Sequence, residues 1–229
     1  MIKAIGFDVG HTLIKYDNPL NLSLLYRPAI DQVINNCNIK YSDENIETAI
    51  SILTKYNTRV NPREIEISSD VIFLEIINSW HEDLNHLNKA KESFFTFLQS
   101  SAAPFIEVEQ VLSKLKSMNI RIGVLTNVAY GMDNQYSLKD IATISKYIDI
   151  TLTSVDVGYR KPNNAGFKML LESFSVKPFE MLFVGDEEAD IIGANNLGIG
   201  SVLINRSNKE LNYGQKYTIN SLSGIMDIL

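Results

Sequence analysis

Short apolar runs recur along the chain, and most of them stop at a polar residue. Runs of this kind occupy residues 4–7, 121–125, 148–153, 181–184 and 200–204. Short apolar segments that contain β-branched residues are typical of strands buried on both faces of a parallel sheet. A further short strand is expected at residues 217–219, followed by a helix over residues 221–229 that docks on the core.

Segments with a helical period separate these runs. Apolar residues recur every three or four positions in residues 107–118, 164–174 and 190–197. That spacing places them on one face of an α-helix. Strands that alternate with helices indicate an α/β fold in which helices cover both faces of a parallel sheet, a Rossmann-like doubly wound arrangement.

One long region departs from this alternation. Between the first strand and residue 101 the chain has helical patterns and no clear strand, with pieces at residues 31–37, 43–56, 69–86 and 89–98. We therefore expect an α-helical domain over residues 17–100. It is inserted into a core made of residues 1–16 and 101–229.

Composition narrows the class of protein. The chain has 229 residues, of which 45% are hydrophobic, enough to bury a sizeable core. Its net charge of −6 and the lack of a basic stripe argue against a general nucleic-acid binder. Cys37 is the only cysteine, which excludes an intramolecular disulfide and a cysteine zinc cluster and fits a reducing compartment.

The apolar runs are also too short for membrane or export segments. None approaches the roughly 20 apolar residues that a membrane-spanning helix needs. The N-terminal run is shorter than the apolar region of a signal peptide and is followed at once by polar residues. We expect a cytoplasmic protein without a membrane partner.

Four of the expected strands end in residues suited to anion or metal chemistry. Ligands of open parallel sheets bind at the carboxyl ends of the strands. Asp8 follows the first strand, where a carboxylate can bind a hard cation or attack phosphorus, or simply cap a turn. Thr126 and Asn127 follow the second, where they can hold a phosphoryl oxygen or cap a helix.

The other two strand ends carry a lysine and an acidic pair. Lys161 precedes Pro162 and can neutralise phosphoryl charge, although alone it would be an ordinary surface lysine. Asp186 and Asp190 are four positions apart, so they share a face if the segment is helical. Paired carboxylates of this kind hold magnesium, but an acidic first turn of a helix has the same pattern.

Together these residues resemble the haloacid dehalogenase superfamily of phosphohydrolases. The ordered set comprises Asp8, Thr12, Thr126, Lys161 with Pro162, and Gly185-Asp186 with Asp190, and smaller matches lie at residues 154–158 and 193–198. The resemblance covers nearly the whole chain. It implies that the helical insertion is a C1-type cap over the core and that the substrate is a small phosphorylated metabolite.

The resemblance also implies a role for each site residue. Asp8 would attack phosphorus and become an aspartyl phosphate, which water then hydrolyses. Thr126 and Asn127 would bind the phosphoryl group, and Lys161 would offset its charge. Mg²⁺ would be held by Asp8, the Gly10 carbonyl and Asp186, with Asp190 as a further ligand or as support for the other ligands.

Gly10 departs from the family pattern. Phosphatases of this family usually carry a second Asp there, which protonates the leaving oxygen and later activates water, a contribution of about 10²–10⁴-fold. His11 is the nearest titratable residue that could replace it. Solvent could also supply the proton, or the substrate could have a good leaving group, such as an acyl or aryl phosphate.

Two further alternatives follow from Gly10. A phosphonate hydrolase has a small residue here and uses a cap lysine, for which Lys40 and Lys55 are available. A site without turnover would bind magnesium and an anion only. Dehalogenation is disfavoured, because dehalogenases of this fold carry a tyrosine at this position and need no metal.

The cap is expected to choose the substrate by closing over the site. Its polar candidates are Arg59, Arg63 and His81, although the sequence favours a solvated helix or loop residue for each of them. The sequence does not indicate an oligomeric state.

Overall fold

The computed structural model describes residues 1–17, 22–99, 102–207 and 209–229. Its centre is a six-stranded sheet in the order β5-β4-β1-β6-β7-β8, in which every pair of neighbours is parallel. The strands are β1 (Ala4–Phe7), β4 (Arg121–Thr126), β5 (Ile150–Thr153), β6 (Met181–Gly185), β7 (Gly200–Ile204) and β8 (Tyr217–Ile219). All six expected strands are therefore present, and β1 lies in the middle of the sheet.

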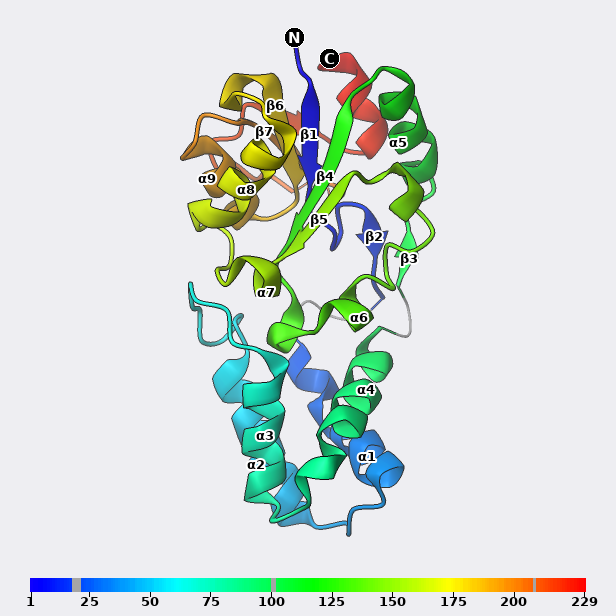
Figure 1. Cartoon of the computed structure of the whole chain (residues 1–229), viewed down its shortest axis with the longest axis vertical. Helices are drawn as coiled ribbons and strands as arrows, with labels where there is room; N and C mark the ends of the chain where they lie inside the picture. Colours follow the sequence, from blue (N-terminus) through cyan, green and yellow to red (C-terminus); the bar gives the residue numbers. More distant parts are fainter. Residues whose placement is uncertain (18–21, 100–101, 208) are drawn as a thin grey trace.

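Helices cover both faces of this sheet, as predicted (Figure 1). Helices α8 (Asn164–Phe174) and α9 (Glu188–Asn195) bury apolar side chains such as Phe167 against Phe183 of β6. Helix α5 (Val108–Ser117) packs on the opposite face, with Leu112 in one cluster with Ile5 and Phe7. The doubly wound α/β class is confirmed.

The C-terminal helix differs from its prediction. The structure has a 3₁₀ helix, η6 (Leu222–Asp227), instead of an α-helix over residues 221–229. Leu222 and Ile225, three positions apart, are both fully buried. A 3₁₀ helix stacks residues at this spacing on one side, so the segment still docks on the core.

The inserted region is helical, with bounds that differ from the expected pieces. It contains α1 (Tyr26–Cys37), α2 (Asp43–Tyr56), α3 (Ser69–Ser79) and α4 (Leu87–Leu98). Helix α1 begins earlier than expected because Tyr26, Ala29 and Ile30 are buried. Helix α3 ends at Ser79 because His81 has a left-handed backbone (φ 56°), and the short 3₁₀ helix η2 (Leu84–His86) follows.

Two short strands missed by the sequence join the two parts of the molecule. β2 (Ile14–Lys15) pairs with β3 (Ala103–Pro104) in antiparallel fashion, so the chain leaves the core and returns to it side by side. The boundary expected between residues 100 and 101 lies outside the described residues. The domain limits of 1–16, 17–100 and 101–229 stay a prediction.

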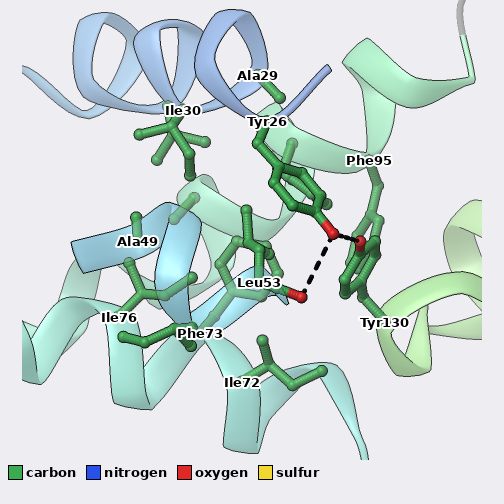
Figure 2. Close-up of a cluster of buried hydrophobic side chains, with 14 of the residues drawn as sticks. Tyr26, Ala29, Ile30, Ala49, Leu53, Ile72, Phe73, Ile76, Phe95 and Tyr130 are labelled. Carbon is green, nitrogen blue, oxygen red and sulfur yellow. Dashed lines mark hydrogen bonds between the residues drawn. The ribbon is translucent and has the colours of Figure 1, made fainter. Parts of the chain in front are cut away.

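The loop after β4 anchors the helical part to the sheet (Figures 1 and 2). Tyr130 of this loop enters the apolar cluster of the helices, and its hydroxyl lies 2.5 Å from that of Tyr26. Asn57 Nδ2 donates to the same Tyr26 hydroxyl at 2.7 Å. Gly131 follows with a left-handed φ of 58°, and a Cβ there would lie only 1.9 Å from Ile67 O. The helices are thereby held over the carboxyl ends of the central strands.

None of the helices in the described ranges combines the length and apolarity that a membrane crossing requires.

Candidate active site

Adjacent strands bring three of the predicted residues together. Asp8 follows β1, Thr126 ends β4 and Asp186 follows β6, and these strands are neighbours in the sheet. Asp8 N donates to Val184 O at 2.9 Å, so the backbone continues the sheet pairing up to the carboxylate. The strand-end prediction is thus met for the group around Asp8.

Lys161 is the charged centre of this group. It is 7% exposed, which excludes an ordinary surface lysine. Its Nζ lies 2.5 Å from Asp8 Oδ1 and 2.7 Å from Asp190 Oδ1, and it donates to Leu125 O at 2.9 Å. Burial alone lowers the pKa of Lys161, but Asp190 and Asp8 together outweigh it, and the net shift is upward. The ammonium therefore stays charged.

Three carboxylates converge beside Lys161. One oxygen from each of Asp8, Asp186 and Asp190 lies within 4.8 Å of the others. Burial, followed by the charges of Asp8 and Asp190, raises the pKa of Asp186 above its ordinary value. A single lysine does not balance three acidic groups, so a divalent cation would relieve their repulsion. Hard oxygen donors at this spacing suit Mg²⁺.

The oxygens of the three carboxylates differ in the groups that they already bind. Asp190 Oδ1 pairs with Lys161, and its Oδ2 accepts from Glu187 N at 3.0 Å. Asp186 Oδ1 accepts from Thr12 Oγ1 at 3.3 Å. Within the described residues, Oδ2 of Asp8 and Oδ2 of Asp186 accept no hydrogen bond. These two open oxygens fit a metal, whereas Asp190 fits as the residue that orients Lys161.

The helical spacing argument for the acidic pair was wrong. Helix α9 begins at Glu188 with Glu187 as its N-cap, so Asp186 lies outside it. The two side chains meet because Asp190 reaches back to the N-cap in a capping box and folds the turn onto the strand end.

Gly10 leaves an open space next to Asp8. A Cβ built on Gly10 would meet one atom, Tyr16 Cε2, at the ordinary contact distance of 3.8 Å. His11 has a left-handed φ of 54°, and its ring lies edge-on to Tyr16 with 6.0 Å between centroids. Burial is the main cause that lowers the pKa of His11, which keeps its imidazole neutral at pH 7. A catalytic role for His11 stays a prediction.

Asn127 uses its amide to position Lys161. Asn127 Oδ1 accepts from Lys161 N at 2.8 Å, and Asn127 Nδ2 donates to Lys161 O at 3.1 Å. The side-chain amide of Asn127 therefore holds the main chain of the lysine, and phosphate binding by Asn127 stays a prediction. Thr126 lines the cavity at the strand end.

A cavity of about 1160 Å³ lies above these residues and below the cap. Of the polar cap residues, Arg59 and Arg63 line it, and His81 lies beyond the far end of α3. Tyr16 and Asp140 also line it and were not predicted; Tyr16 Oη donates to Asp140 Oδ2 at 2.6 Å. Tyr16 follows β2 and Asp140 lies in the loop between β4 and β5. Neither segment has an apolar period or a motif that would have indicated a site.

Lys161 is expected to matter for stability as well as chemistry. Lys161→Met leaves Asp8 and Asp190 buried without their cation, and breaking a buried pair in this way costs about 3–5 kcal/mol of unfolding free energy. Because the remaining cluster is more negative, Mg²⁺ should stabilise the variant more than the wild type. Thermal unfolding of both proteins in EDTA and in Mg²⁺ measures this.

Lys168→Met is the matched control, because Lys168 is exposed on α8. Equal melting temperatures for Lys161→Met and wild type in EDTA would contradict the inferred role of the ion pairs.

Comparisons with known proteins agree with this geometry. The family model described as "Haloacid dehalogenase-like hydrolase" matches residues 32–204. A protein named glyceraldehyde 3-phosphate phosphatase, from Methanothermobacter thermautotrophicus, is 26% identical over 238 residues, which cover 100% of both chains.

Solved structures share the fold over the whole chain. A HAD phosphatase from Thermococcus onnurineus has a TM-score of 0.66 at 23% identity and covers 99% of this chain and 97% of its own. A 2-haloacid dehalogenase from Pseudomonas syringae has a TM-score of 0.70 at 20% identity and covers 100% and 98%. With a match over residues 32–204 and the strand-end cluster in place, the chain belongs to the haloacid dehalogenase-like hydrolase family and is a phosphatase-like hydrolase.

Proposed function

We propose that this protein is a magnesium-dependent cytoplasmic phosphatase that cleaves a small phosphorylated metabolite through an aspartyl phosphate at Asp8. The observation that carries the proposal is the 2.5 Å contact of Lys161 Nζ with Asp8 Oδ1 beside Asp186, at the floor of a covered cavity. The contact with Lys161 fixes the position of the Asp8 carboxylate at the end of β1.

The residues divide the reaction between them. An oxygen of Asp8 forms a bond to phosphorus while the ester bond breaks and its electron pair goes to the leaving oxygen. Lys161 offsets the charge on the transferring group, and Thr126 holds one of its oxygens. Water then attacks the phosphorus of the aspartyl phosphate, which releases inorganic phosphate and restores Asp8.

The acidic cluster would hold the cation. Asp8 and Asp186 supply open carboxylate oxygens, the Gly10 carbonyl is a third donor, and Asp190 supports Lys161. Bound Mg²⁺ would supply Lewis-acid stabilisation of phosphoryl charge.

The relatives favour a phosphate ester as the substrate. Two proteins named glyceraldehyde 3-phosphate phosphatase match this chain over its whole length, from Methanothermobacter thermautotrophicus at 26% and Methanocaldococcus jannaschii at 27% identity. A phosphonate hydrolase finds less support, because Lys55 pairs with Glu75 at 2.8 Å and neither Lys55 nor Lys40 lines the cavity.

Turnover of a generic aryl phosphate tests the proposal. We expect hydrolysis of p-nitrophenyl phosphate in Mg²⁺ and its loss in EDTA, with recovery when Mg²⁺ is added back. An aryl leaving group needs little proton assistance, so the lack of a side chain at Gly10 should not mask the activity. Binding of Mg²⁺ and phosphate without turnover on a broad panel of phosphate esters would instead identify a binding protein.

A further inference from the structure

Several cationic side chains line the cavity besides the one that the proposed reaction uses. Besides Lys161, its lining includes Arg59, Arg63, Arg160 and Lys168. Lys168 is exposed on α8. The arginines differ in what already binds them, and this difference identifies which of them is available to a substrate.

Arg63 and Arg160 are committed to a buried carboxylate. Glu66 has a side chain only 2% exposed and binds both, through Arg63 Nη2 at 3.2 Å and through Arg160 Nη1. Arg63 Nη1 also donates to Tyr56 O at 2.6 Å. Arg160 Nη1 also donates to Val128 O at 2.8 Å, and Arg160 Nη2 donates to Thr58 Oγ1 at 3.4 Å. These contacts tie the loop between α2 and α3 to the core, so removing either arginine would take one of two cationic partners from the buried Glu66 carboxylate.

Arg59 is held differently. Its guanidinium pairs with Glu187, and the two side chains are 46% and 35% exposed. Burial lowers the pKa of Arg59, but Glu187, then Asp186 and Asp8, raise it further than burial lowers it. Arg59 and Asp8 line the same cavity, and the negative charge of Asp8 acts on the guanidinium. A partly exposed ion pair of this kind contributes little to stability and exchanges easily.

We infer that Arg59 is a specificity-determining residue that binds a carboxylate or a second phosphate on the leaving group, and that Glu187 occupies its guanidinium until such a substrate arrives. The inference rests on the proposed phosphatase function and narrows its substrate to phosphomonoesters with a second anionic group.

The exchange is chemically balanced. A guanidinium presents paired N–H donors that match two oxygens of a carboxylate or phosphate. The oxyanion of the substrate takes the place of the Glu187 carboxylate beside Arg59, so the guanidinium keeps an anionic partner throughout. A substrate whose leaving group carries only hydroxyl or aldehyde groups cannot make this replacement, and Arg59 stays with Glu187.

A three-carbon series isolates the second anion. 3-Phosphoglycerate, glyceraldehyde 3-phosphate and glycerol 3-phosphate differ in having an acid, an aldehyde or an alcohol at the far carbon. We expect the wild type to prefer the acid, and Arg59→Gln to lower the acid-to-alcohol ratio of kcat/KM about 10–100-fold, the range for a lost charge-assisted hydrogen bond. The change should lie mainly in KM. For a second phosphate, the corresponding measurement is the ratio of kcat/KM for propane-1,3-diol bisphosphate to kcat/KM for its monophosphate.

Glu187→Gln provides a variant with the opposite expected sign. Removing the competing carboxylate frees Arg59, so the acid-to-alcohol ratio should rise by about 1.5–5-fold, as for loss of an exposed ion pair. Arg27→Gln is the matched control. Arg27 pairs with Asp43 at 2.9 Å and Glu47 at 3.2 Å on the surface of the cap, away from the cavity, and its ratio should equal that of the wild type.

Binding separates this inference from the proposed function. Calorimetric titration of the same acid and alcohol into Asp8→Asn protein, with and without Arg59→Gln, measures the ratio of their dissociation constants without any turnover. Absence of wild-type turnover on the broad panel of phosphate esters overturns the phosphatase proposal only. An unchanged acid-to-alcohol ratio in Arg59→Gln, or a wild-type preference for the aldehyde or alcohol, overturns the role of Arg59.

Discussion

Asp8→Asn is expected to lower kcat by about 10⁴–10⁶-fold, the scale on which loss of a covalent nucleophile acts. The asparagine amide has nearly the shape of the carboxylate, but it cannot form the acyl phosphate. Lys161 keeps its contacts with Asp190 at 2.7 Å and with Leu125 O at 2.9 Å, so its position should survive. The measurement is kcat for p-nitrophenyl phosphate in Mg²⁺, with thermal unfolding to show that the variant is folded.

Asp140→Asn is the matched control for this variant. Asp140 lines the same cavity but pairs with Tyr16 and Gln99 instead of Lys161. The Asp140→Asn substitution removes one carboxylate from the cavity and leaves the proposed nucleophile in place. We expect kcat to change less than about tenfold, within the spread of a single lost hydrogen bond. Retention of more than about 1% of kcat in Asp8→Asn would show that another group attacks phosphorus.

The sequence was most informative where local chemistry decides the structure. Helix α8 has the predicted bounds of 164 and 174, because Asn163 caps its start and Ser175 takes a left-handed backbone at its end. Helix α2 likewise starts after Ser42, which accepts a hydrogen bond from Asn45 N. The position of Asp8 at a strand end follows from the abrupt change from apolar to polar residues.

Contacts between distant segments were not predictable in this way. Asn127 looked like a phosphate ligand, but its amide binds the main chain of Lys161, 34 residues on. Arg59 and Glu187 are 128 residues apart and meet only because the cap folds over the core. Residue type and spacing within one segment contain no information about such pairs.

Gly10 has no side chain that could protonate the leaving oxygen, and there is space beside it for one. Gly10→Asp should raise kcat on alkyl phosphates by about 10²–10⁴-fold, because general acid catalysis contributes that much when the leaving oxygen needs a proton. The structure has room for the new side chain, whose Cβ would meet only Tyr16 Cε2 at 3.8 Å. The same substitution should change aryl phosphate turnover little, because a phenolate leaves without a proton.

The dependence on the leaving group distinguishes acid catalysis from a simple change in shape. Gly10→Asn places a side chain of equal size and no acidity at the same position, and it should gain nothing on either class of ester. The measurement is kcat for a series of esters whose leaving groups span a wide range of pKa. A wild type that already cleaves alkyl phosphates as fast as Gly10→Asp would mean that another group, with His11 the nearest titratable one, already delivers the proton.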